Sequence, residues 1–283
     1  MATRIAVLTD ALSNQHFFPV WHGYYGALFG PENLYVITYT GGTGFDGIPL
    51  GGLVRLPVGY DDTTRANVIS DFVATLLGAY DVVVRVDADE LLVVDPRAAP
   101  DLRTYIEASR RPYYTARGFD VVQTSGEAPM HDGLLLPQRK LAYPNTAGNK
   151  TAITRVPLHW SSGFHWCSAY PDFGPLFMLH LKRIDVDWQM RWFAEITRNI
   201  SANKAVAQEI KDYYIPDRDK ILAYHEGVSI RARIAGIENW YRETLQQNFL
   251  GTISYNPADD IYYGEFAHDH VLCEIPLAWK QLF

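Results

Sequence analysis

The chain has 283 residues, of which 48% are hydrophobic and 20% charged, and it carries a formal net charge of -7. This length and composition fit one large soluble α/β domain, or one domain with a smaller addition. The negative charge argues against nucleic acid as a partner, because proteins that bind nucleic acids present a basic surface.

The first 86 residues contain two successive strand–helix–strand patterns, which are typical of right-handed βαβ units. Each apolar or β-branched run predicts a strand, and Pro19 and Asp61 stand where helices begin. The predicted strands lie at 5–8, 34–39, 53–56 and 81–86.

Further strands are predicted at 113–122, 151–156 and 176–181. After residue 185, apolar residues at helical spacing predict one helix through Trp188 to Ile200 and another through Ile230 to Leu245. We therefore predict an α/β fold with a mixed, mainly parallel sheet flanked by helices. Residues 1–185 would form its core, and residues 186–283 a helical extension packed on that core.

The segment Asp87-Ala88-Asp89-Glu90 interrupts a buried apolar run, since Leu91 to Val94 resume it at once. It follows a predicted parallel strand, and ligands of open α/β sheets bind at the carboxyl ends of such strands. Carboxylates one residue apart can share a hard divalent cation, which would offset the cost of burying them. A solvated turn or helix cap is the plainer alternative.

A second segment, 148–183, is rich in cations and imidazoles near predicted strand ends. A diphosphate leaving group requires fixed positive charge around its oxygens. The candidates are Lys150, Arg155, His159, His165, His180, Lys182 and Arg183.

With these motifs the chain resembles the GT-A-fold, DXD-type glycosyltransferases, in particular the family-two-like enzymes. The acidic segment 87–90 is similar to the DXD signature in its D-x-D-E form. Residues 21–26, Trp-His-Gly-Tyr-Tyr-Gly, resemble the W-x-x-Y-H stretch, and residues 180–182, His-Leu-Lys, resemble the late H-x-K element. The resemblance covers about residues 4 to 200.

The resemblance implies a Rossmann-like GT-A fold and a Mn²⁺ or Mg²⁺ ion held by Asp87, Asp89 and His180. Lys182 would face the phosphates of a nucleoside-diphosphate sugar, with a UDP type favoured, and Asp10 would hold its base or ribose. Lys150 and Arg155 would add positive charge at the nucleotide. The implied activity is hexosyl transfer to a glycan or another hydroxyl acceptor, in bacterial glycan synthesis.

An inverting transferase needs a general base within hydrogen-bond reach of the attacking hydroxyl. The usual acidic base motif is not recognisable, and Asp172, Asp120 and Glu195 are equal candidates by position. His165 could orient the acceptor or a phosphate, with Trp166 as a stacking surface. A structural role for His165 is the alternative.

Three other readings stay open. A non-catalytic carbohydrate-binding protein of the same fold would bind glycans without nucleotide or metal. An aspartate-nucleophile phosphatase also uses Asp-x-Asp, but its motif normally follows the first strand. Zinc held by His159, His165 and Cys167 would not match a standard spacing.

The two cysteines, Cys167 and Cys273, imply no disulfide framework and favour a reducing compartment. The chain opens without the apolar core of a signal peptide and has no run long enough to span a bilayer. We therefore expect a cytoplasmic protein, with peripheral membrane contact and oligomeric state left open.

Overall fold

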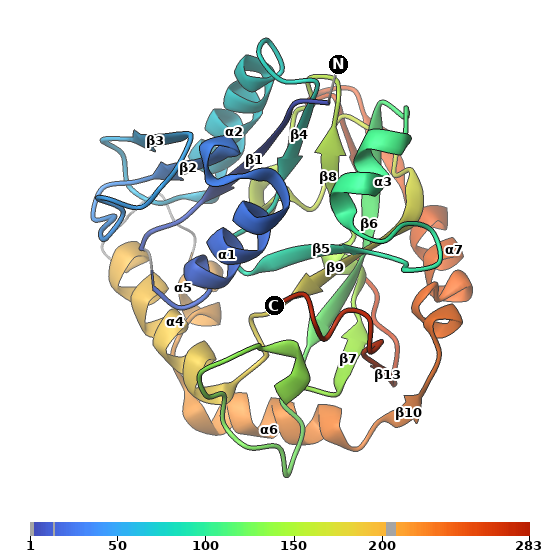
Figure 1. Cartoon of the computed structure of the whole chain (residues 1–283). Coiled ribbons are helices and arrows are strands. Elements are labelled where there is room, and N and C mark those ends of the chain that lie inside the picture. Colours follow the sequence, from blue (N-terminus) through green and yellow to red (C-terminus); the bar gives the residue numbers. More distant parts are fainter. Residues whose placement is uncertain (1–2, 14, 202–207) are drawn as a thin grey trace.

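The computed structural model describes residues 3–13, 15–201 and 208–283. They form an α/β fold in which helices cover a large mixed sheet (Figure 1), and this confirms the predicted fold class. The strands are β1 (Ile5–Asp10), β2 (Leu34–Thr38), β3 (Gly52–Arg55), β4 (Val82–Arg85), β5 (Glu90–Val94), β6 (Tyr113–Val121), β7 (Leu141–Pro144), β8 (Thr151–Thr154), β9 (Phe173–His180), β10 (Ala232–Ile234), β11 (Ser254–Asn256), β12 (Ile261–Tyr263) and β13 (Val271–Glu274). The α-helices are α1 (Phe18–Phe29), α2 (Asp62–Leu76), α3 (Leu102–Ala108), α4 (Val186–Ile200), α5 (Gln208–Tyr213), α6 (Arg218–Ser229) and α7 (Glu243–Gly251).

The large sheet has the strand order β10-β13-β7-β6-β8-β4-β1-β2-β3, which runs in Figure 1 from the lower right to the left. β3, β2, β1 and β4 are mutually parallel, as the two predicted βαβ units require. β9 pairs in parallel with β6 and antiparallel with β5. It therefore joins the strand that follows the acidic segment to the middle of the sheet.

Alternation along the buried strands places α1 and α2 on opposite faces of the sheet. Val7 belongs to the same apolar cluster as Trp21 of α1, whereas its neighbour Leu8 packs with Ile69 of α2. The α2 helix begins as predicted, with the Asp61 side chain accepting the backbone N–H of Thr64 at 2.8 Å.

The aromatic residues of α1 hold β5 in place. Trp21 and Tyr25 are fully buried. The Tyr25 hydroxyl accepts the Leu92 N–H at 2.9 Å and donates to the Glu90 carbonyl at 3.2 Å. The segment that resembled W-x-x-Y-H is therefore a packing element, which fixes the strand immediately after the acidic residues.

The carboxyl-terminal segment is only partly helical. α4 lies where it was predicted, but the helix expected from Ile230 to Leu245 is wrong. Gly236 takes φ 94° and Arg242 takes φ 44°, left-handed conformations that a continuous helix excludes. The chain instead forms β10, which pairs with β13, and β13 pairs with β7 of the central sheet. The division of the chain at residue 185 stays a prediction.

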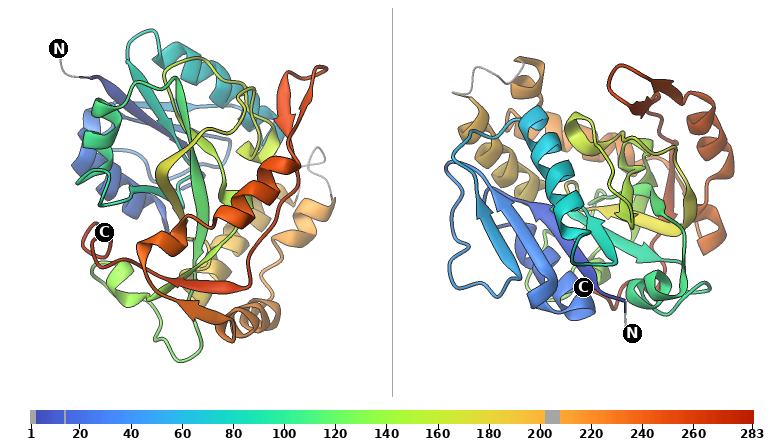
Figure 2. Two further views of the ribbon diagram at one scale, coloured as in Figure 1. Left: turned by 90° about the vertical axis from the view of Figure 1, so that its right-hand side faces the viewer. Right: turned by 90° about the horizontal axis from the view of Figure 1, so that it is seen from above.

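No helix among the described residues is long and apolar enough to cross a membrane. Cys167 and Cys273 are both buried free thiols, as the absence of a disulfide framework predicts. Figure 2 shows the β11–β12 hairpin projecting from the body of the molecule, beyond α7.

Candidate active site

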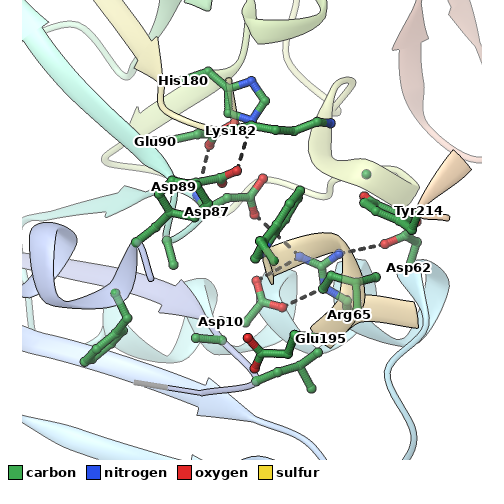
Figure 3. Close-up of a pocket in the computed structure, with 18 of the residues that line it drawn as sticks. Asp10, Asp62, Arg65, Asp87, Asp89, Glu90, His180, Lys182, Glu195 and Tyr214 are labelled. Carbon is green, nitrogen blue, oxygen red and sulfur yellow. Dashed lines mark hydrogen bonds and ion pairs between the residues drawn. The ribbon is translucent and has the colours of Figure 1, made fainter. Parts of the chain in front are cut away.

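A cavity of about 330 Å³ opens at the carboxyl ends of β1, β4 and β9, where the sheet topology predicts a ligand site. Its wall includes the acidic segment, the end of β9, the first turn of α2, part of α4 and the loops around residues 145–150 and 163–165. Figure 3 shows charged side chains from the end of β1, α2, the acidic segment, the end of β9 and α4 gathered around a common space. Most of the predicted site residues therefore converge, although they come from distant parts of the chain.

Asp87 is ionised, and two cations balance its charge inside the protein. Its Oδ1 accepts a hydrogen bond from Arg85 at 2.6 Å, and its Oδ2 accepts one from Lys150 at 2.7 Å. Burial opposes ionisation, but Arg85 and Lys150 outweigh it and hold the pKa of Asp87 well below its usual value. Lys150 also lies 2.6 Å from Glu90 Oε1. Asp87 and Lys150, which were expected at the metal and at the nucleotide, therefore already have partners within the protein.

Asp89, His180 and Asp120 form a chain across three strand ends. The His180 Nε2 lies 3.1 Å from Asp89 Oδ2, and its Nδ1 lies 2.6 Å from Asp120 Oδ1. The pairing of β9 with both β5 and β6 creates this contact, since His180 lies opposite Glu90 on one side and Asp120 on the other.

The two carboxylates keep His180 charged. Burial alone would lower the pKa of this imidazole, but Asp89 and Asp120 together raise the pKa to about 10. The same imidazolium, with Arg183, holds the pKa of Asp120 far below its ordinary value although burial acts in the opposite sense. Asp120 also accepts hydrogen bonds from Tyr143 and from Asn145. Asp120 is therefore a partner that orients His180, and it is not free to accept a proton from a substrate.

Asp10 is fully engaged by arginines. Arg65 Nε lies 2.6 Å from Asp10 Oδ2, and Arg85 Nη2 lies 3.4 Å from Oδ1. Arg65 in turn lies 2.7 Å from Asp62 and 4.4 Å from the ring centre of Tyr60. Both carboxylate oxygens have arginine partners and the side chain has no exposed surface, so the expected contact of Asp10 with a base or ribose is not made ready by this arrangement.

Lys182 is the cation best placed for a phosphate. It lines the cavity, and among the described residues it has the Tyr213 hydroxyl but no carboxylate as a partner. Its Nζ lies 4.6 Å from the ring centre of Tyr213 and 5.7 Å from that of Trp192, so aromatic faces hold the side chain in position. Arg183 beside it stacks 3.7 Å from the ring centre of Tyr224.

Two of the predicted residues, Asp172 and Arg155, do not line this cavity. Asp172 forms a surface ion pair with Arg111 at 2.9 Å. Arg155 donates to the carbonyls of Ile106 and Ser109 at 2.8 and 2.9 Å, and so closes the end of α3. Asp172 comes just before β9 and Arg155 just after β8, so both lie at the edge of the sheet opposite the carboxyl ends of β1 and β4.

Glu195 and His165 do line the cavity. Glu195 lies 3.3 Å from His16, which with Ser13 lowers the pKa of the carboxyl against the effect of burial. His165 donates from Nδ1 to the Ala147 carbonyl at 2.7 Å, and burial lowers the pKa of its imidazole to about 3. His165 is therefore neutral, with its Nε2 left as a hydrogen-bond acceptor.

The metal set predicted from the sequence fits only in part. No three His, Cys, Asp or Glu side chains within 3–13, 15–201 and 208–283 form a group that could hold a metal ion unaided. Asp87 does not fit as a ligand, because Arg85 and Lys150 occupy it. Asp89 and His180 do fit, since a carboxylate such as Asp120 at the distal imidazole nitrogen commonly orients a metal-binding histidine. The alternative zinc set fails, because His159 is exposed whereas Cys167 is buried.

Several residues of the site were missed. Arg85 could have been found, because residues i and i+2 of a strand face the same side and Asp87 follows it at that spacing. Arg65, Tyr213 and Tyr214 gave no local signal, since only tertiary packing brings them to the cavity.

Comparison with known proteins adds little. No family model matches the chain, and no curated protein matches it. Among solved structures, it is similar to mannose-1-phosphate geranyltransferase from Thermus thermophilus, at 10% identity and a TM-score of 0.29 over 85% of this chain and 68% of that one. A TM-score of this size indicates neither a shared fold nor a shared chemistry.

Proposed function

We propose that the chain is a glycosyltransferase that moves a hexosyl group from a nucleoside-diphosphate sugar, with a UDP type favoured, to a hydroxyl acceptor with inversion. The observation that supports it best is the cavity itself, where Asp89, His180 and Lys182 face one space at the carboxyl edge of the sheet. A carboxylate and an imidazole beside a lysine that has no carboxylate partner in the described part of the chain suit a metal and the diphosphate that it accompanies.

Asp89 and His180 would hold Mn²⁺ or Mg²⁺, and the metal would supply positive charge to the departing diphosphate. His180 must lose its Nε2 proton to bind it, while Asp120 keeps Nδ1 in place. Lys182, and Arg183 next to it, would contact the phosphate oxygens and stabilise the charge that develops on the leaving group. Asp87 and Lys150 would not contact the substrate. Their ion pair would instead position Asp89, because it fixes the turn that carries this residue.

The acceptor hydroxyl would attack the anomeric carbon while a base takes its proton. Of the three predicted bases, Asp172 lies outside the cavity and Asp120 is engaged by His180. This leaves Glu195 for the role, through exchange of its present partner His16 for the acceptor.

A thermal-shift series with UDP, GDP, CDP and ADP, each with and without Mn²⁺, tests the proposal. We expect one nucleotide to raise the melting temperature only with Mn²⁺, by an amount that corresponds to about 2.7 kcal/mol at one hundred times the dissociation constant. Asp89→Asn should abolish this metal-dependent increment, since a neutral amide is a poor ligand for Mn²⁺.

Asp172→Asn is the matched control, because it makes the same chemical change on an aspartate outside the cavity, and it should respond as the wild type does. An unchanged metal-dependent increment in Asp89→Asn would remove Asp89 from the metal site. Stabilisation by sugars without any nucleotide effect would favour the non-catalytic carbohydrate-binding alternative.

A further inference from the structure

Three aromatic rings form a stack beside the cavity. Trp166 packs nearly parallel to both Phe249 and Phe266, with ring centres 5.6 and 5.1 Å away and interplanar angles of 9° and 8°. Two phenyl rings therefore contact the indole that the sequence suggested as a stacking surface, and the indole remains partly exposed. Phe249 is buried, whereas Phe266 is 51% exposed. Phe266 is thus the phenyl ring of the stack that a ligand can reach.

The stack is continuous with the cavity wall. The ring of His165, which lines the cavity, packs edge-on against Phe266 with 5.0 Å between the ring centres. The backbone next to Phe266 is also fixed, because Thr146 N–H donates to the Ala267 carbonyl at 2.8 Å and Ala267 N–H donates to Thr146 Oγ1 at 2.6 Å. Thr146 precedes Ala147 and Gly148, which line the same cavity.

The stack is also closely packed. Trp166 contacts two phenyl rings, and a Cβ at Gly264 would lie 2.7 Å from Ile253 Cδ1, 2.9 Å from Thr252 Oγ1 and 3.2 Å from Trp166 Cη2, so the turn before Phe266 packs against the stack. An exposed phenyl ring that packs on a second ring near a polar cavity offers apolar surface to a flat partner.

We propose that Phe266 is the platform on which a saccharide acceptor stacks, with His165 Nε2 accepting a hydrogen bond from one of its hydroxyls. The inference rests on the proposed function and adds the acceptor class to it. A sugar ring has an apolar C–H face and a hydroxyl edge, which match a phenyl face next to an unprotonated imidazole nitrogen. One exposed ring matches one sugar ring, whereas a stable protein interface needs about 800 Å² from each partner.

Saturation-transfer NMR tests this directly, with methyl α- and β-glycosides of glucose, galactose, mannose and N-acetylglucosamine, and with maltose and cellobiose, as probes. At least one probe should receive saturation from the wild-type protein through its C–H face. Phe266→Ala should weaken that binding about tenfold. Phe266→Tyr should retain it, and Phe266→Leu, which keeps apolar bulk without a ring, should lose most of it.

Leu134→Ala is the control, because Leu134 is also 51% exposed and lies in another loop. Nucleotide stabilisation with Mn²⁺ is recorded for each variant and should not change, which separates this inference from the proposed function. Wild-type protein that binds the nucleotide but none of the saccharides, or a Phe266→Ala variant that binds them as the wild type does, would overturn the inference alone. Absence of any nucleotide effect would instead overturn the proposed function.

Discussion

Two histidines on the cavity wall are held in opposite charge states by their partners. His180 lies between Asp89 and Asp120, and these carboxylates raise the pKa of its imidazole to about 10. His165 has a backbone carbonyl as its partner, so burial prevails and lowers the pKa to about 3. Similar burial thus gives two different protonation states, because the partners of the two imidazoles differ: His180 is charged in the absence of a metal, and His165 is neutral.

The neutral histidine predicts a dependence of stability on pH. An unfolded histidine has a pKa of about 6.5, so between pH 6.5 and about 3 the unfolded chain binds a proton at His165 that the folded chain excludes. The free energy of unfolding should therefore fall as the pH falls below 6.5, by up to about 1.4 kcal/mol per pH unit from this group. Urea denaturation at pH 6.5, 5.75 and 5.0 measures the slope.

His165→Gln should show a smaller loss over the same range, because its amide can still donate to Ala147 but does not titrate. His159→Gln, at an exposed position, should keep the slope of the wild type. Equal slopes in all three proteins would show that His165 does not exclude a proton in the folded state.

At the scale of elements, the close approach of β6 to the turn at residues 145–148 shapes the cavity. A Cβ at Gly118 would overlap the Cα of Gly148 and the carbonyl oxygen of Asn145. Glycine is required at position 118, since only a residue without a side chain lets the turn pack against β6.

Gly118→Ala should therefore destabilise the fold by about 1–3 kcal/mol, because backbone has to move to admit the methyl group. Chemical denaturation followed by tryptophan fluorescence gives this free energy of unfolding. Gly227→Ala is the matched control, since a Cβ there meets no atom within 4 Å and the position lies inside α6. It should stabilise by about 0.5–1 kcal/mol. Destabilisation of equal size in both variants would contradict the steric argument.

The elements that the sequence predicted correctly are those with local causes. The apolar run of β4 and the Asp61 cap of α2 are local signals, and both were predicted in place. The pairing of β9 with β5 and β6, and the insertion of β13 beside β7, join residues far apart in the chain, so no local pattern contains them.

The same distinction separates the predicted site residues. Asp89 and His180, which were expected at the ligand edge because each ends or follows a strand, do line the cavity. Arg155 lies away from the cavity, because the sequence shows the end of a strand but not the edge of the sheet at which that strand ends. Phe266 was missed because its neighbours in the stack, Trp166 and Phe249, become neighbours only in the fold.

At the scale of the whole molecule, the carboxyl-terminal segment completes the core of the sheet. Trp240 has no exposed surface and stacks on Phe119 of β6, with ring centres 4.2 Å apart. Its indole N–H donates to the Glu274 carbonyl at 2.9 Å, and its ring meets Trp279 edge-on at 4.7 Å. Trp279 in turn donates to the Val94 carbonyl of β5 at 2.8 Å, so the segment is tied to the strand that follows the acidic residues.

Because these contacts place residues from 1–185 and from 186–283 in one core, we expect the two parts of the chain to unfold together. Trp240→Ala should lower the free energy of unfolding by about 3–5 kcal/mol, as other deletions of large buried rings do, and should do so in one transition. Urea denaturation followed by far-ultraviolet circular dichroism and by fluorescence tests this, since coincident curves indicate a two-state process. Leu277→Ala, at a position that is 79% exposed, should change stability by less than about 0.5 kcal/mol. The opposite result would be two separate transitions in Trp240→Ala, the first of which changes only part of the helical signal. It would show that the carboxyl-terminal segment is an independent unit packed on a core that is stable without it.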